Sequence, residues 1–259
     1  MTNNNSKVED IKELGVLVVI PTYNNEKTLS KIIEDVLMYT PDVLVVNDGS
    51  TDSTTEILDK FGDRINTISY SKNRGKGYAL KQSFKYAEQN NYNYVISIDS
   101  DGQHFAEDIP VFVNQIAEKP NSMIVGSRSF SQEHMKAGSS FANKFSNFWF
   151  TVQTGKKLPD TQSGYRLYPI KHIRKTDILT NRYETELEIL VRLAWKNVSI
   201  IPVDINVYYP PESEKISHFR PFTDFFRISV LNTFLSVVAI IYGYPSILFH
   251  CLKNRFTNE

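Results

Sequence analysis

The chain has 259 residues, 41% of them hydrophobic, and its 29 Lys and Arg residues balance its 29 Asp and Glu residues. This length can bury one full α/β core with a short appendage. The balanced charge gives no basic field for nucleic acid, so we expect no DNA or RNA partner. The single cysteine, Cys251, excludes an internal disulfide framework, and the histidines fall in no zinc-ligand spacing.

Segment 1–13 is polar and lacks the apolar run of a signal peptide. We therefore expect it to be disordered and the catalytic part to lie in the cytoplasm. From residue 16 onward, short β-branched runs alternate with amphipathic stretches, which predicts an α/β fold with a mostly parallel central sheet flanked by helices. The predicted strands are 16–20, 43–47, 65–70, 94–98, 123–127 and 199–203.

Helices are predicted between the strands. The first has apolar residues at helical spacing, which allows one face to cover the sheet: Leu29, Ile32, Ile33, Val36 and Leu37. After residue 127 the pattern becomes irregular and aromatic, and a helix near 141–150 packs on the core or forms an acceptor wall. A helix over 183–196 precedes the last strand.

Polar segments follow the first four predicted strands. They are 21–26, 48–52, 73–77 and 99–104. Ligands of open α/β sheets bind beyond the carboxyl ends of the strands, so these segments are where a site is expected. Any one of them alone would be explained by ordinary turn chemistry. Four in succession favour a binding edge.

Asp99 and Asp101 form the sharpest pair at this edge. Residues two apart at a strand end project to the same side and can offer oxygen ligands to one hard cation. The pair therefore predicts Mg²⁺ or Mn²⁺, which would neutralise the charge on a departing diphosphate. A bare Asp-x-Asp pair is common by chance, so its position after a buried strand carries the prediction.

A dinucleotide-dependent oxidoreductase would also use a parallel sheet, with an acidic residue after the second strand, here Asp48. That class needs Gly-x-Gly-x-x-Gly after the first strand, where this chain has Pro-Thr-Tyr-Asn-Asn-Glu. The P-loop pattern is also missing from the sequence. Both classes are excluded.

From about residue 16 to 220, these segments together resemble glycosyltransferase family 2 with its GT-A, Rossmann-like fold. The closest likeness is to the dolichyl-phosphate mannose synthase and polyprenyl-phosphate glycosyltransferase branch. The resemblance implies metal ligands Asp99, Asp101 and Gln103. It also implies contacts to the nucleotide-sugar from Pro21, Tyr23, Glu26, Asp48, Arg74, Lys76, Asp99, Ser100 and Asp101.

The family also resembles this chain around Arg128 and in 163–166, where Arg128 and Arg166 are expected near donor or acceptor phosphates. The alternative for each is a surface salt bridge. The segment 212–220 departs from the loop usual in mannose synthases. A phosphate loop is still expected there from Lys215, His218 and Arg220.

The resemblance implies inversion in a single displacement. A hydroxyl acceptor needs a carboxylate base, for which Asp160, Glu184 and Glu186 are candidates. Glu184 and Glu186 are two apart on a predicted helix and cannot both face one site. A polyprenyl phosphate is already largely ionised at neutral pH and needs no strong base. Asp160, the favoured catalytic carboxylate, would then position the acceptor.

The expected activity is hexose transfer from a UDP- or GDP-sugar to a membrane lipid, with polyprenyl phosphate favoured, in cell-envelope assembly. One alternative is an inverting transferase that acts on a hydroxyl of a glycolipid or glycan. A sugar nucleotidyltransferase is less favoured because its usual Gly-rich loop after the first strand does not occur here. A catalytically silent binding or scaffold protein of the same fold is the remaining alternative function. Association into a homo-oligomer is a separate question that the sequence leaves open.

The predicted division is a catalytic domain over 14–221 and an apolar helical tail over 222–259. Within the tail, 228–252 has no formal charge and is flanked by Arg227, Lys253 and Arg255. Its length would allow a membrane span, but 243–245 interrupts it. A re-entrant or interfacial helix pair at the cytoplasmic membrane face is therefore preferred to a kinked span or to a buried or dimer-forming helix.

Overall fold

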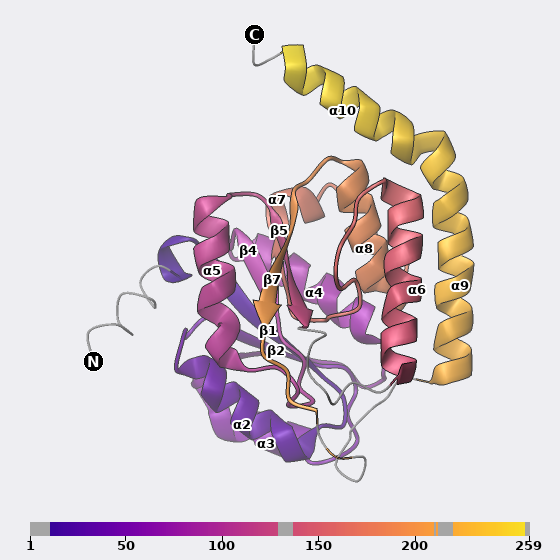
Figure 1. Cartoon of the computed structure of the whole chain (residues 1–259). Helices are drawn as coiled ribbons and strands as arrows, with labels where there is room; N and C mark the ends of the chain where they lie inside the picture. Colours follow the sequence, from indigo (N-terminus) through magenta and orange to yellow (C-terminus); the bar gives the residue numbers. More distant parts are fainter. Residues whose placement is uncertain (1–10, 129–136, 210, 212–219, 257–259) are drawn as a thin grey trace.

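The computed structural model describes residues 11–128, 137–209, 211 and 220–256. A seven-stranded sheet with the order β3-β2-β1-β4-β6-β5-β7 forms the centre of the described chain (Figure 1). Its strands are β1 (Val16–Thr22), β2 (Val43–Asn47), β3 (Asn66–Ser69), β4 (Tyr94–Ser97), β5 (Met123–Arg128), β6 (Arg166–Pro169) and β7 (Ile200–Ile205). All pairings are parallel except those of β6 with β4 and β5. The predicted mostly parallel sheet is confirmed, but β6 was not predicted.

Helices cover both faces of the sheet. They are α2 (Glu26–Leu37), α3 (Thr54–Phe61), α4 (Lys76–Gln89), α5 (Ile109–Glu118), α6 (Ala137–Thr154), α7 (Ile170–Ile173), α8 (Glu184–Trp195), α9 (Pro221–Val238) and α10 (Tyr244–Phe256). Short 3₁₀ turns lie at Gly62–Arg64 and Ala106–Asp108, and the π-helical turn η3 (Ala239–Gly243) joins α9 to α10. Each polar segment predicted above therefore connects a strand to a helix or a 3₁₀ turn.

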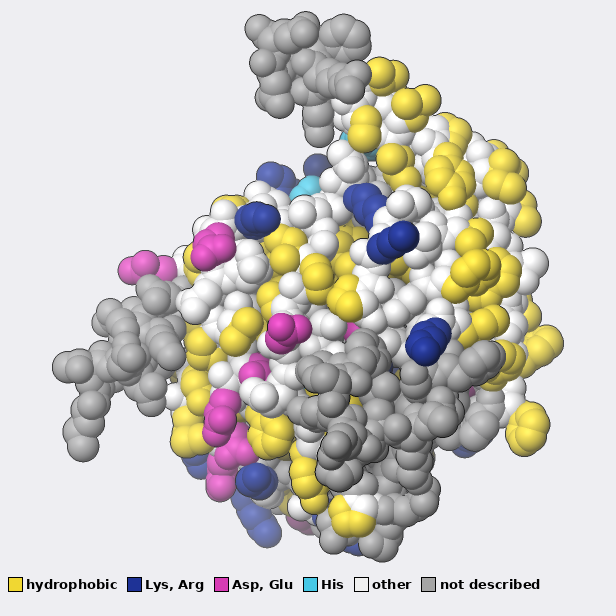
Figure 2. Space-filling view, in the orientation of Figure 1, with side chains coloured by type: hydrophobic (Ala, Val, Ile, Leu, Met, Phe, Trp, Pro, Cys, Tyr) yellow, Lys and Arg dark blue, Asp and Glu magenta, His cyan; other side chains and the backbone are white. Residues whose placement is uncertain are grey.

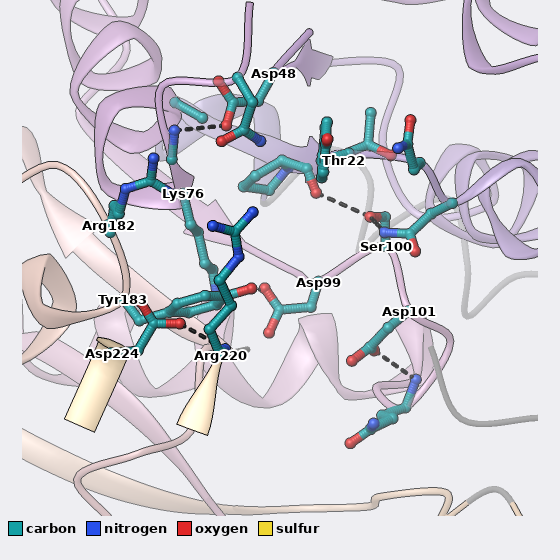
Figure 3. Close-up of a pocket in the computed structure, with 18 residues that line it drawn as sticks. Thr22, Asp48, Lys76, Asp99, Ser100, Asp101, Arg182, Tyr183, Arg220 and Asp224 are labelled. Carbon is teal, nitrogen blue, oxygen red and sulfur yellow. Dashed lines mark hydrogen bonds and ion pairs between the residues drawn. The ribbon is translucent and has the colours of Figure 1, made fainter. Parts of the chain in front are cut away.

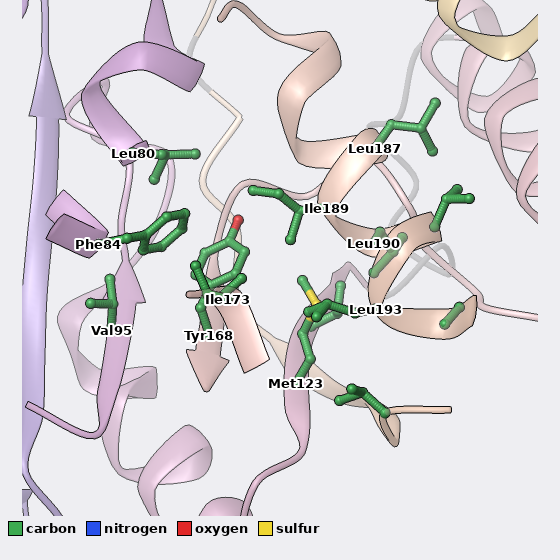
Figure 4. Packing of buried hydrophobic residues seen from close by; sticks show 14 of the residues in the cluster. Leu80, Phe84, Val95, Met123, Tyr168, Ile173, Leu187, Ile189, Leu190 and Leu193 are labelled. Atoms are coloured by element: carbon green, nitrogen blue, oxygen red, sulfur yellow. The ribbon is translucent and has the colours of Figure 1, made fainter. Parts of the chain in front are cut away.

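Alternate residues of β1 belong to two cores, as the period-two geometry of a strand requires. Val16, Val18 and Ile20 pack with apolar residues of α2, α3 and α5 on one face. Leu17 and Val19 pack on the other face with α4 and α8. Figure 4 shows part of this second cluster, with Leu80 and Phe84 of α4 and Leu187 of α8. A sheet buried on both sides explains why the strand sequences are continuous apolar runs.

The tail helix α9 lies along the domain, outside α6 and α8 (Figure 1). Its inner residues Leu231 and Leu235, and Ala239 of η3, are buried in the same cluster as α4 and α8. The side chain of Gln153 donates to the Asn232 carbonyl (3.2 Å) and amide oxygen (3.0 Å), which joins α6 to α9. The helix α9 therefore packs directly on the predicted catalytic domain.

The chain bends at η3 and α10 then leaves the body of the domain (Figure 1). Gly243 lies against the buried indole of Trp195, because a Cβ at Gly243 would come within 2.5 Å of its nitrogen. The indole nitrogen donates to the Gln153 carbonyl (2.7 Å), and Ser246 donates to the Trp195 carbonyl (2.9 Å). The interruption predicted at 243–245 is therefore a bend fixed by contacts with the domain.

The predicted disorder of 1–13 is wrong at its end. Residues 11–13 are helical, and Ile11 is buried in the core with α2 and α5. The remainder of that prediction falls on residues 1–10, outside the described residues.

Candidate active site

A cavity of about 700 Å³ opens at the carboxyl edge of the sheet (Figure 3). Residues of the four polar segments that follow β1 to β4 form most of its wall, as expected for an open α/β sheet. Its lining is Pro21, Thr22, Tyr23, Asn24, Asn25, Asp48, Asn73, Gly75, Lys76, Ala79, Asp99, Ser100, Asp101, Gln103, Arg182, Tyr183, Arg220 and Asp224.

Asp48 shapes one end of the cavity by holding the next loop. Its two carboxylate oxygens accept the backbone N–H groups of Arg74 and Gly75, each at 2.7 Å. Burial raises the pKa of Asp48, although these two donors act to lower it. Gly49 has φ +72°, and a Cβ there would lie 2.4 Å from the Lys72 backbone, so only glycine allows the two loops to approach this closely.

Ser100 ties the first loop to the loop that carries the aspartates. Its hydroxyl accepts from the Asn25 amide (2.6 Å) and donates to the Pro21 carbonyl (3.0 Å). Thr28 donates to the Ser100 carbonyl at 2.5 Å. These contacts hold the backbone between Asp99 and Asp101 in place, so the two carboxylates stand on a fixed support.

Asp99 and Asp101 lie with Lys76 at the centre of the cavity wall (Figure 3). The Lys76 Nζ is 2.6 Å from Asp99 Oδ1 and 3.2 Å from Glu186 Oε1. Burial raises the pKa of Asp99, but Lys76 and His104 lower it further, so the net shift is downward. Burial and the charge of Asp99 raise the pKa of Asp101 to about 6.

This carboxylate pair fits a hard divalent cation. Crowding that raises the pKa of Asp101 would be relieved by a positive charge between the two groups. Gln103 also lines the cavity, and its backbone N–H donates to Asp101 Oδ1 at 3.0 Å. Within the described ranges, no group of three or more His, Cys, Asp and Glu side chains is arranged to hold a metal. A cation here would need amide or phosphate oxygens as further ligands.

Gly164 lies directly against Asp99 and Lys76. A Cβ on Gly164 would lie 2.5 Å from both Asp99 Oδ2 and Lys76 Nζ. The backbone of the segment before β6 therefore lies against Asp99 and Lys76. This close approach explains the need for glycine at 164.

Arg128 and Asp160 are joined to each other and do not line the cavity. Arg128 donates to Asp160 through Nε (2.6 Å) and Nη2 (3.0 Å), and the Asp160 side chain is fully buried. Burial raises the pKa of Asp160, but Arg128 lowers it further, so its net shift is downward. In this arrangement Asp160 positions Arg128 and is a poor general base.

Arg166 does not line the cavity, although a phosphate contact was predicted for it. It is fully buried, and its guanidinium donates to three backbone carbonyl groups, those of Ser163 (2.6 Å), Glu186 (2.7 Å) and Thr161 (2.7 Å). These bonds tie the segment before β6 to α8. In this arrangement the Arg166 guanidinium is already used by backbone carbonyls, which argues against the predicted catalytic role.

Three other predicted residues also lie outside the cavity wall. Glu26 accepts the backbone N–H of Ser53 at 3.0 Å. Arg74 donates to the Tyr78 hydroxyl at 2.8 Å and stacks on its ring. Glu184 is buried. Lys215 and His218 fall outside the described residues.

Arg182, Tyr183 and Asp224 line the cavity although the sequence did not indicate them. Arg182 lies in the loop before α8, whereas Asp224 is in the first turn of α9 and accepts the backbone N–H of Arg220 at 2.7 Å. Among the described residues, neither Arg182 nor Arg220 has a salt-bridge partner. Two arginines thus enter the cavity with donors available for an anion.

The family model described as Glycosyl transferase family 2 matches residues 17–176. Among curated proteins, the chain is 24% identical over 216 residues to the UDP-N-acetylglucosamine–dolichyl-phosphate N-acetylglucosaminyltransferase of Methanococcus voltae, covering 75% of this chain and 86% of that protein. It is 26% identical over 205 residues to the polyprenol monophosphomannose synthase of Mycolicibacterium smegmatis, covering 73% and 76%.

Among solved structures, the chain is similar to glucosyl-3-phosphoglycerate synthase from Mycobacterium tuberculosis. A complex of that protein with Mn²⁺, UDP and glucosyl-3-phosphoglycerate aligns with a TM-score of 0.65 at 16% identity, over 92% of this chain and 82% of that one. A likeness at this identity bears on the fold. The expected GT-A-like fold is confirmed.

Proposed function

Since the chain belongs to glycosyl transferase family 2, we propose that it transfers a hexose from a UDP- or GDP-sugar to polyprenyl phosphate at the cytoplasmic face of a membrane. The names of the two curated relatives, one a dolichyl-phosphate and the other a polyprenol-phosphate enzyme, support the lipid acceptor. The observation that carries the proposal is the cavity, which is lined by Asp99 and Asp101 and also by Arg182 and Arg220. Carboxylates for a cation and arginines for phosphates suit a nucleotide diphosphate.

In this proposal the nucleotide lies between the loops after β1 and β2, against Tyr23 and Asp48. Asp99, Asp101 and Gln103 hold Mg²⁺ or Mn²⁺, which neutralises charge on the leaving diphosphate. Arg182 and Arg220 bind the phosphate oxygens from the other wall. The planar fork of a guanidinium group matches the geometry of phosphate oxygens.

The positions of Asp160 and Glu184, two of the predicted bases, favour an acceptor that is already charged. Asp160 is held by Arg128 with a lowered pKa, and neither Asp160 nor Glu184 lines the cavity. A hydroxyl acceptor would need a base placed within hydrogen-bond reach. A phosphate acceptor is ionised at neutral pH and needs none.

The outer face of the tail supports membrane association. The segment Phe222–Lys253 is long and apolar enough to cross a membrane, and only 22% of its most apolar window is buried. Apolar side chains gather over α9 and α10 (Figure 2), and those exposed include Phe222, Phe226, Val230, Val237, Ile240, Ile241, Leu248 and Phe249. Asp224, the one acidic residue of 220–256, is buried and lies 3.8 Å from Arg227, so no acidic side chain of this segment faces anionic lipid.

The packing of α9 favours a helix that lies in the interface over one that spans. Its inner face is buried against α6 and α8 along most of its length. A bilayer-spanning α9 would have to expose the polar surface of the whole domain to hydrocarbon or leave its core contacts. With α9 at headgroup level, a lipid-linked phosphate would be presented beside Arg220 at the cavity.

A donor panel tests the proposal. Full-length protein is incubated with UDP- and GDP-sugars and Mn²⁺ or Mg²⁺, with and without polyprenyl phosphate in vesicles, and free nucleotide diphosphate and glycolipid are measured. We expect one donor to give glycolipid only when metal and polyprenyl phosphate are both present. Transfer to a glycan or glycolipid hydroxyl with no transfer to polyprenyl phosphate would contradict the proposed acceptor.

A further inference from the structure

Lys76 occupies the position next to Asp99 where a divalent cation is expected. Its Nζ contacts Asp99 Oδ1 at 2.6 Å, and its side chain is 14% exposed. We propose that Lys76 is the cation that neutralises Asp99 before the donor binds, so that the divalent metal binds together with the nucleotide diphosphate and only weakly before it. This inference rests on the proposed function.

The Lys76 ammonium and a divalent metal would compete for the carboxylate of Asp99. A Mg²⁺ or Mn²⁺ ion bound to a carboxylate oxygen lies about 2.0–2.2 Å from it. With the ammonium at 2.6 Å from the same carboxylate, the two cations would be neighbours in a buried site where water screens little. The ammonium also neutralises Asp99 and removes part of its attraction for a metal. Metal entry therefore requires that Lys76 moves or that new negative charge arrives.

The surroundings limit where the ammonium can go. The backbone of Gly164 closes the site beneath Lys76 and Asp99, at a distance that leaves no room for even a methyl group. Glu186 lies 3.2 Å from Nζ on the other side and offers a second carboxylate. The remaining direction is the cavity itself, since Lys76 is one of its lining residues.

A nucleotide diphosphate supplies the missing negative charge. Lysine has a flexible stem and three rotatable donors, so Lys76 can turn from Asp99 towards a phosphate oxygen while keeping Glu186. Asp99 is then free to join Asp101 at the metal. Metal and nucleotide would each tighten the binding of the other by the same factor, as linkage requires.

Two variants move the metal affinity in opposite directions. Lys76→Met removes the competing cation, so the protein should bind Mn²⁺ without nucleotide roughly tenfold tighter than the unmodified chain, a coupling of ordinary size. Glu186→Gln leaves the ammonium with Asp99 as its one carboxylate, so Mn²⁺ alone should bind more weakly. Lys81→Met, on the same helix but lining a different cavity, should leave Mn²⁺ binding unchanged.

The measurement is titration of Mn²⁺ into full-length protein, with free Mn²⁺ followed by electron paramagnetic resonance, in the absence and presence of UDP or GDP. Thermal melting with and without Mn²⁺ shows that each variant is folded, and Mn²⁺ alone should raise the melting temperature most in Lys76→Met. If Lys76→Met melts too early to titrate, Lys76→Gln and Glu186→Gln provide the same opposed pair.

Three outcomes are distinguishable. Tighter Mn²⁺ binding in Lys76→Met, with the mutual tightening between Mn²⁺ and nucleotide reduced, supports the inference. Unchanged or weaker Mn²⁺ binding in folded Lys76→Met, or tighter binding in Glu186→Gln, overturns it even where nucleotide still binds. Failure of the unmodified protein to bind any nucleotide diphosphate with metal overturns the proposed function as well.

Discussion

The two halves of the predicted site behave differently in the structure. After β1 to β4, the polar side chains at the strand ends line one cavity, with Asp48, Lys76 and Asp101 among them. Around β5 and β6, Arg128 pairs with Asp160 and Arg166 is used by backbone carbonyls. Polar groups after β1 to β4 therefore face a ligand space here, whereas Arg128 at the end of β5 and Arg166 at the start of β6 bind protein groups outside the cavity wall.

Burial explains why Arg166 is not part of the cavity. The carboxyl ends of β1, β2 and β4 meet at one edge, so the residues that follow them share one space. β6 runs the other way, so its first residue, Arg166, lies at this same edge and pairs with Ser97, the last residue of β4. Its side chain then lies inside the helical layer that includes α8, where its buried donors need partners.

The comparison is tested most strongly at Asp101. Asp101→Asn keeps the shape of the side chain but removes a charge from the proposed metal site, and transfer should fall on the order of 10³-fold. Turnover is measured with saturating Mn²⁺, and EDTA should abolish transfer by the unmodified protein. Stability should change little, because Asp101 lies at the cavity and outside both apolar cores. Normal turnover of the variant in chelator would remove Asp101 from the chemistry.

Gly164 is where the two halves touch. Gly164→Ala would place a methyl 2.5 Å from Asp99 and Lys76, so the pair must shift. Misplacement of about 1 Å in a catalytic group can cost roughly 10²-fold in rate, and we expect a loss of that order in steady-state turnover. Gly62→Ala is the control for activity, because its methyl meets nothing within 4 Å; its φ of +50° adds backbone strain, which should lower its stability and leave the site in place. Equal activity of the two variants would show that the site accepts a methyl group at residue 164 without displacement of Asp99 and Lys76.

The third prediction concerns the buried hydrogen bonds of Arg166. Arg166→Ala would leave the carbonyls of Thr161, Ser163 and Glu186 without their donor in a buried place. Each unsatisfied group costs about 1–3 kcal/mol, so unfolding free energy should fall by about 3–4 kcal/mol in urea denaturation. The folded fraction should keep nucleotide affinity. A stable variant that cannot bind nucleotide would restore the phosphate role that the sequence suggested.

The sequence was sufficient where local pattern and position coincide. Apolar runs identified β1, β2 and β4, and the polar residues after them identified the cavity. It was insufficient where partners are distant along the chain. β6 is a short strand of four residues inside a segment that also carries a family motif, so no periodicity separated it from a loop.

Arg182 shows the second limit. It follows no strand, and it reaches the cavity because Gly75 and Gly77 pack closely on the backbone and side chains of 181–185. A Cβ at Gly77 would meet the side chain of Thr185. Such a contact between segments about a hundred residues apart is a property of packing, which local sequence pattern does not encode.

The smallest expected effect concerns the outer face of the tail, which contrasts with its own inner face. Ile241 is 74% exposed, whereas Leu235 is fully buried. If the outer face lies in a membrane interface, Ile241→Ser reduces the apolar area that contacts lipid and leaves the core of the protein unchanged. Full burial of such a side chain contributes about 1.5–3 kcal/mol, so partial burial predicts roughly tenfold weaker binding to vesicles of anionic lipid in sedimentation, with an unchanged melting temperature.

Met38→Ser is the matched control, because Met38 is 60% exposed at the end of α2, which covers the other face of the sheet. Equal vesicle binding by both variants would mean that lipid does not contact this face, and the partner of the α9 surface would then be sought in a second copy of the chain.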